Sequence, residues 1–353
     1  MYTILRSQGT LTRQESLNPK WQQPFPGNLS KLPKSFAEVV EIVTGFVFDE
    51  FDREITEKQL YYHNREHING VRKRANLIWQ IIYPEKDHQI SQNLARMQVL
   101  LDLCANAHDL VQVFLPQTEP HTSRKREAGV SETLTIEKLY DYINQLNNQL
   151  RECQVDESLL FTKADLSIIE EAILATICIY EPSEQAIYQP ALYEPNQDLS
   201  PIARILALAD IGALGMEGIT AYNQEGSLLF LEENPDVIQI IYEGKRESLA
   251  LDNSQLHENI RQRLLKRAQF QINFAKSRLN RYQQEISSFS AETISVLTNE
   301  TFKFLNPETI KQIEAEIPTA QDTPLEVLLT FFNLEKYISS LVNNCSKEVN
   351  FPC

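Results

Sequence analysis

The chain has 353 residues, of which 42% are hydrophobic and 23% charged, with only 10 glycines. This composition is typical of a globular protein and argues against a low-complexity chain or a glycine-rich β-architecture. The formal net charge of -15 disfavours extended nucleic acid or an anionic membrane surface as a partner, because both require a broad positive field. The 5 cysteines are never spaced as CxxC, so we expect neither a disulfide framework nor a structural zinc site.

Length and polarity suggest three regions: an extended arm at 1–34, a main domain at 35–250 and a helical extension at 251–353. The arm is polar and interrupted by several prolines. Its start lacks the continuous apolar core of a signal peptide, and no later stretch reaches the ~18 apolar residues of a membrane span. We therefore expect a soluble, cytoplasmic protein.

The apolar spacing predicts helices throughout the main domain. The first begins at Ser35, which can form a capping box with Glu38, and runs to about residue 57. Apolar residues at every third or fourth position predict further helices at about 66–83, 92–108, 125–151, 165–180, 201–216 and 230–248. Strand-type alternation is nowhere sustained, so the expected fold class is all-α, a helical bundle with a carboxy-terminal helical extension.

The extension begins with a long predicted helix at about 253–288. This helix could pack as a hairpin or form a homodimer contact, and its basic residues are interpreted as a solvated face. Further helix starts are indicated at Asn306, which precedes a proline, and at Thr323, which precedes another.

The residues that could carry chemistry are separated in the sequence. His63 and His67 are four positions apart, so on a helix one imidazole can bind a metal while the other delivers a proton. The adjacent His108 and Asp109 can converge on the edge of one ion. Asp210 lies in the apolar run ARILALADIGALG, where a buried carboxylate must be neutral, paired or bound to metal. Such donors suit a divalent ion (Mn, Mg, Fe or Zn), and the pattern does not choose among these metals.

The order YHNREH, then HD, then the later aspartate resembles the HD superfamily of metal-dependent phosphohydrolases. The form YHN-x-x-H is similar to that of class I cyclic nucleotide phosphodiesterases and of uncharacterised bacterial HD phosphohydrolases. The resemblance covers roughly residues 35–220 and implies an all-α bundle. It implies four metal ligands: His67, His108, Asp109 and Asp210. By the same resemblance Asp109 could bridge to a second ion, and His63 would give a proton to the leaving oxygen.

Five further residues are candidates around that centre. The resemblance places Glu127 as a catalytic acid near the activated water and Thr176 beside the substrate. Arg74 lies two helical turns after the second histidine and could reach a substrate phosphate bidentately. Arg124 opens a basic run that could also bind substrate. Asn64 either closes the turn before the helix or orients a ligand or substrate oxygen.

These residues predict hydrolysis of a phosphomonoester or phosphodiester in a small phosphorylated or nucleotide-like substrate. The chain lacks the glutamine and aromatic clamp of GQ-x-GF type, so a cyclic nucleotide is not singled out. A (d)NTP or alarmone hydrolase competes with a cyclic phosphodiester hydrolase, and His63 as an acid favours the diester. The alternative is a non-catalytic HD module that binds a nucleotide or a partner protein. Ile177 and Cys178, where a further ligand is expected, keep that alternative open.

Overall fold

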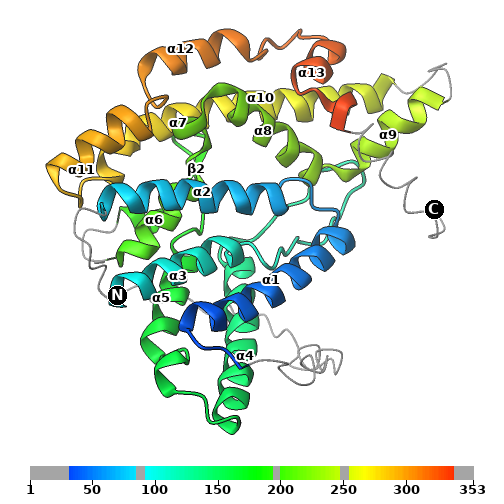
Figure 1. Cartoon of the computed structure of the whole chain (residues 1–353). Coiled ribbons are helices and arrows are strands. Elements are labelled where there is room, and N and C mark those ends of the chain that lie inside the picture. The colour runs from blue at the N-terminus through cyan, green and yellow to red at the C-terminus, as the bar shows by residue number, and fades with distance from the viewer. Residues whose placement is uncertain (1–31, 85–91, 194–198, 247–253, 338–353) are drawn as a thin grey trace.

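The computed structural model describes residues 32–84, 92–193, 199–246 and 254–337 (Figure 1). Nearly all of the predicted arm lies outside these residues, as does the predicted boundary between main domain and extension, so both stay predictions. Before that boundary the elements are α1 (Phe36–Lys58), α2 (Arg65–Ile82), α3 (Gln92–Ala107), α4 (Val130–Glu152), η2 (Glu157–Leu159), α5 (Lys163–Leu174), β1 (Ile179–Glu181), β2 (Ala186–Tyr188), η3 (Pro190–Leu192), α6 (Pro201–Asp210), α7 (Ala213–Glu217), α8 (Ile219–Glu233) and α9 (Pro235–Arg246). After it come α10 (Ser254–Glu285), α11 (Ala291–Val296), the π-helical turn η4 (Leu297–Thr301), α12 (Pro307–Glu316) and α13 (Leu325–Phe331). The all-α prediction is confirmed.

Several helices begin where their capping residues predict. The side chain of Ser35 accepts a hydrogen bond from the backbone of Glu38 at the start of α1. Ser200 caps α6 and Asn306 caps α12, and in both helices proline occupies the first turn. Local sequence therefore fixes the start of α6, the helix that carries Asp210.

Four predicted helices were wrong in extent. The helix predicted at 201–216 is divided, because α6 ends at Asp210 and α7 begins at Ala213. The helix predicted from 125 begins only at Val130, because Gly129 has a φ of 83° that interrupts the chain there. The helix predicted to 180 ends at Leu174, and β1 and β2 follow as an antiparallel hairpin that the sequence did not indicate. The segment predicted as one helix at 230–248 is divided at Asn234, because Pro235 starts a new helix.

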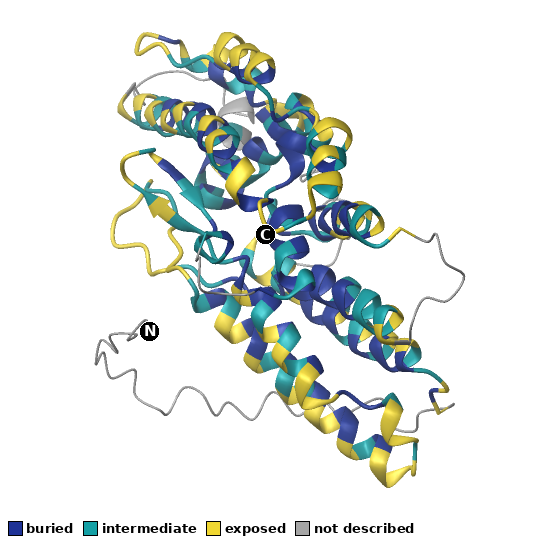
Figure 2. Ribbon diagram, turned by 90° about the vertical axis from the view of Figure 1, so that its left-hand side faces the viewer, coloured by how far each residue is buried: buried dark blue, intermediate teal, exposed yellow. Residues whose placement is uncertain are grey.

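The helices form two layers that share one core. In the first layer α2, α3 and α6 pack together, with α1 against α3 and α4 against α5 (Figure 1). In the second, α10 packs against α8, α12 and α13. One cluster of buried apolar side chains extends from Phe36 to Leu334, and Figure 2 shows the buried faces of the helices turned toward the interior. None of the described helices has the length and apolar character needed to cross a membrane.

Candidate metal centre

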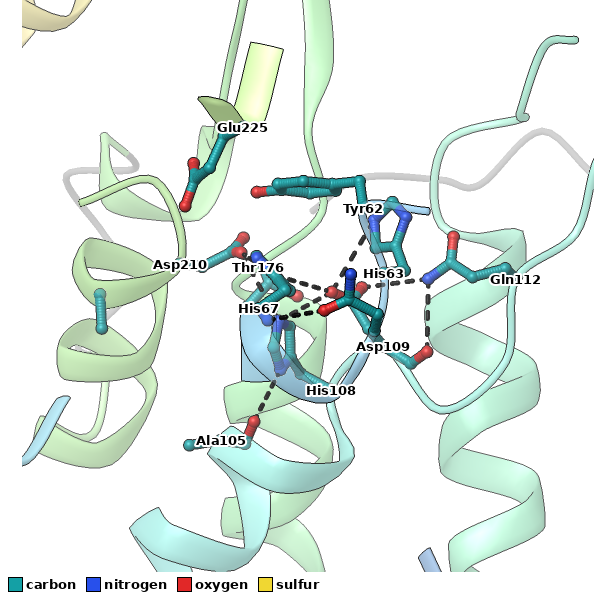
Figure 3. Close-up of polar contacts among 12 residues, drawn as sticks. Tyr62, His63, His67, Ala105, His108, Asp109, Gln112, Thr176, Asp210 and Glu225 are labelled. Atoms are coloured by element: carbon teal, nitrogen blue, oxygen red, sulfur yellow. Dashed lines mark hydrogen bonds and ion pairs between the residues drawn. The ribbon is translucent and has the colours of Figure 1, made fainter. Parts of the chain in front are cut away.

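The packing of α2, α3 and α6 brings together the four predicted metal ligands (Figure 3). His67 lies in the first turn of α2, and His108 and Asp109 form the turn directly after α3. Asp210 is the last residue of α6. Each offers one ligand atom, and these atoms all lie within 4.8 Å of one another. The four residues predicted as ligands therefore lie together, although they come from α2, the turn after α3 and α6, and their role as ligands stays a prediction.

Two imidazole nitrogens face two carboxylate oxygens in this group. His67 Nε2 lies 3.1 Å from Asp109 Oδ2 and 3.6 Å from Asp210 Oδ1, and His108 Nε2 lies 3.0 Å and 3.5 Å from the same two oxygens. Neither nitrogen has a hydrogen-bond partner among the described residues, although both are buried. Two buried imidazole nitrogens that lack hydrogen-bond partners and converge on two carboxylates fit a cation-binding site better than a closed network of hydrogen bonds.

The outward atoms of three ligands are held by neighbouring groups. His108 Nδ1 lies 3.0 Å from the carbonyl oxygen of Ala105. Gln112 donates to Asp109 Oδ1 at 3.1 Å, and Gln189 donates to Asp210 Oδ2 at 3.0 Å. Because these contacts occupy the outward atoms, the inward atoms are left to face the centre.

The charges of the four residues support one another. Burial alone would raise the pKa of Asp210, but contact with His108 and His67 lowers the pKa to about 2. Burial alone would lower the pKa values of both histidines, but the nearby carboxylates of Asp109 and Asp210 raise them. A metal cation would therefore compete with protons for these two imidazoles.

His63 lies beside the four ligands and is oriented by Glu232, a residue that the sequence did not point to. His63 Nδ1 lies 2.5 Å from Glu232 Oε1, and the other carboxylate oxygen accepts from the backbone amides of Tyr61, Tyr62 and His63. Burial alone would raise the pKa of Glu232, but contact with His63 lowers this pKa to about 2. The buried carboxylate therefore fixes both the turn and the imidazole ring.

The other ring nitrogen of His63 faces the centre. His63 Nε2 lies 3.8 Å from Asp109 Oδ2, and Arg126 Nη1 donates to it at 3.0 Å. Arg126 also donates to the side-chain oxygen of Gln112 at 2.5 Å. Because a guanidinium can only donate, this contact requires a His63 Nε2 that carries no proton and is lost when Nε2 takes one up.

Arg124 and Arg74, both predicted to contact substrate, hold the scaffold. Arg124 donates to the carbonyl oxygens of Glu232 and Lys58, at 2.8 Å and 2.7 Å. Arg74 is buried, and it donates to the carbonyl oxygen of Ala209 at 2.7 Å, next to the ligand on α6. These bonds anchor the carboxy-terminal ends of α1, α6 and α8, and a substrate contact of either arginine stays a prediction.

The remaining predicted residues are distributed around the site. Asn64 accepts from the amides of Glu66 and His67 at 2.8 Å and 3.0 Å, which gives it the capping role. Thr176 is buried and donates to the carbonyl oxygen of Ile173 at 2.8 Å. Glu127 is exposed, outside the helix in which it was predicted. Their roles toward water or substrate stay predictions.

Two glutamates that no sequence pattern singled out interact with the centre. Burial, assisted by the charge of Asp109, raises the pKa of Glu132. Burial also raises the pKa of Glu225 against the opposing charge of Arg74. Figure 3 shows Glu225 and Tyr62 on the side of the ligand group away from Ala105. No local pattern distinguishes these glutamates from the many exposed ones.

Fold and site together describe an all-α protein with a His and Asp group that could hold a metal ion. No protein-family model, curated protein or solved structure matches the chain. The resemblance to the HD superfamily therefore depends on the sequence pattern alone and stays an expectation.

Proposed function

We propose that the protein is a metal-dependent phosphohydrolase of the HD type, which cleaves a phosphomonoester or phosphodiester in a small, nucleotide-like substrate. The observation that carries the proposal is the position of His63, an imidazole oriented by buried Glu232, beside a group of four potential metal ligands. A structural metal site needs the ligands only. An oriented imidazole next to them is what the departure of an alkoxide requires.

The residues present fit a divalent cation, because two neutral imidazoles and two carboxylates satisfy manganese, magnesium, iron or zinc. The four ligands would hold it, and the bound ion supplies an activated water and polarises a phosphoryl oxygen. Access is on the carboxylate side, since the side chains of Asp109 and Asp210 are 16% and 15% exposed, whereas those of His67 and His108 are 2% and 1% exposed. One or two ions are compatible with the proposal.

His63 is the proposed proton donor. Glu232 keeps Nδ1 protonated through its hydrogen bond, so the proton that moves is carried at Nε2, the nitrogen that faces the centre. Nε2 takes up that proton from solvent before cleavage, and the buried carboxylate stabilises the resulting imidazolium. The proton then passes to the leaving oxygen.

Arg126 is the proposed first contact for the substrate phosphate. Its guanidinium occupies the position next to His63 Nε2 that a leaving oxygen would take. Protonation of Nε2 removes the acceptor for this bond, so the guanidinium becomes free to bind phosphate oxygens. In this proposal the basic run contributes Arg126 to the site.

The test is manganese-dependent release of p-nitrophenol from bis(p-nitrophenyl) phosphate and from p-nitrophenyl phosphate. We expect activity in the wild type, no activity in Asp109→Ala and full activity in Asp322→Ala, which removes an exposed carboxylate. The ratio between the two substrates ranks diester against monoester. A wild type that binds manganese and hydrolyses neither would favour the non-catalytic module.

A further inference from the structure

Gln189 is a buried amide with one partner in the candidate metal centre. Its side chain is wholly buried, and Nε2 donates to Asp210 Oδ2 at 3.0 Å. The opposite oxygen, Asp210 Oδ1, faces both ligand histidines. Because a carboxylate can rotate about its terminal bond, this hydrogen bond selects the orientation that presents Oδ1 to the centre.

The backbone places Gln189 between two small elements. It directly follows β2 and caps η3, where its carbonyl oxygen accepts from Leu192 at 3.2 Å. The hairpin is only two strands, paired from Ile179 opposite Tyr188, and a two-stranded hairpin is marginally stable by itself. The position of Gln189 therefore depends on what holds the hairpin.

Helix α10 packs against β2 (Figure 1), and one of its arginines makes several contacts with the hairpin. The Arg281 guanidinium lies 4.1 Å from the ring centre of Tyr188 and 5.1 Å from that of Tyr193, the two tyrosines that flank Gln189 and η3. The same guanidinium donates to both carboxylate oxygens of Glu184 in the hairpin turn, at 2.9 Å and 2.7 Å. The Arg281 guanidinium thus contacts two neighbouring aromatic rings and forms a bidentate ion pair, and this combination of contacts is specific.

A second, buried set of contacts supports the same segment. Tyr193 donates to Glu285 at the end of α10, and Arg278 pairs with the same carboxylate. Ser277 donates to Glu184 at 2.5 Å. Contacts from α10 therefore reach the hairpin turn and the residue after η3, on both sides of Gln189.

We infer that Gln189 is a positioning residue for Asp210. We further infer that α10 sets the position of Gln189 through its contacts with the hairpin. The extension thus acts on metal binding although α10 contributes none of the four ligands. The inference rests on the proposed metal centre. It gives the extension a role within the same chain, independent of dimerisation.

The experiment measures Mn²⁺ affinity by titration calorimetry and the melting temperature in EDTA. Gln189→Met keeps length and volume and removes the donor, so we expect Mn²⁺ binding about 10- to 100-fold weaker at a nearly unchanged melting temperature. Arg281→Ala, at a partly exposed position, should weaken binding about 3- to 10-fold through the same contact. The control is Lys276→Ala on α10, which removes an exposed ion pair with Glu314 of α12 and should bind Mn²⁺ as the wild type does.

The double variant separates the two parts of the inference. If α10 acts through Gln189, Gln189→Met combined with Arg281→Ala binds Mn²⁺ no more weakly than Gln189→Met alone. If the losses of Mn²⁺ affinity in the two single variants multiply in the double variant, the role of α10 is overturned. Wild-type affinity in Gln189→Met overturns the inference as a whole. A wild type that binds no Mn²⁺ overturns the proposed centre as well, which distinguishes the two failures. Should Gln189→Met not fold, Arg281→Ala against Lys276→Ala still decides the effect of α10.

Discussion

The contact between His63 and Glu232 gives a prediction for stability that needs no metal. Glu232→Gln keeps the shape of the side chain and removes its charge. Burial opposes the ionised form, yet the charge and hydrogen bonds of His63, together with Arg126, lower the pKa of Glu232 from 4.5 to about 2. The ionised carboxylate therefore stabilises the fold at neutral pH.

The magnitude follows from the shift. A pKa lowered from 4.5 to about 2 corresponds to about 3 kcal/mol of folding free energy at pH 7, at about 1.4 kcal/mol per pH unit. Because the folded pKa is depressed, this stabilisation is complete above pH 4.5 and is lost as the pH falls toward about 2. We expect the difference between wild type and Glu232→Gln to be about 3 kcal/mol at pH 7 and about 2 kcal/mol at pH 3.5.

Urea unfolding at these two pH values measures the difference. The control is Glu233→Gln, which changes the neighbouring carboxylate, partly exposed and 3.9 Å from Arg267. It should lose less than about 1 kcal/mol at either pH. A loss in Glu232→Gln as small as in this control would refute the reasoning, and so would a loss that does not depend on pH.

Three further predictions concern the proposed chemistry. His63→Asn should slow hydrolysis of a diester with an alkyl leaving group by about 10²- to 10⁴-fold. The loss should be much smaller for a diester that releases p-nitrophenolate, because this group departs without a proton. Equal losses on both substrates would exclude an acid role for His63. Arg126→Ala should raise KM for a phosphate substrate about tenfold, whereas the control Lys125→Ala should change KM little. Identical kinetic constants in the two variants would remove Arg126 from the substrate site. Mn²⁺ affinity should increase with pH above 6.5, because His67 and His108 have raised pKa values and must lose protons to bind metal; calorimetry at two pH values would contradict this if the affinity were constant.

The sequence predicted those parts of the fold that local signals determine. Capping residues such as Ser200 and Asn306 marked helix starts because the cap is a contact within one turn. The β1 and β2 hairpin was missed because strands of three residues are too short for alternation to appear. Gly129 could have indicated the later start of α4, since a glycine before an apolar run often marks a helix boundary.

The candidate site likewise contains residues that could be predicted from the sequence and residues that could not. His67 and Asp210 could be predicted because their residue types and order resemble a known pattern. Glu232 could not, because its contact with His63 spans 169 residues and nothing in the run FLEEN separates it from Glu233. Gln189 has the same limitation, since a single glutamine between a tyrosine and a proline carries no signal until α6 and the hairpin are placed side by side.

The most direct test of the central claim is the anomalous difference density of crystals grown with MnCl₂. We expect a peak bounded by His67, His108, Asp109 and Asp210, with ligand nitrogens and oxygens at about 2.0 to 2.3 Å. The same peak should be missing from crystals of Asp210→Asn. Density without an ion at this position, or manganese bound by other residues, would contradict the metal centre and the hydrolysis proposed for it.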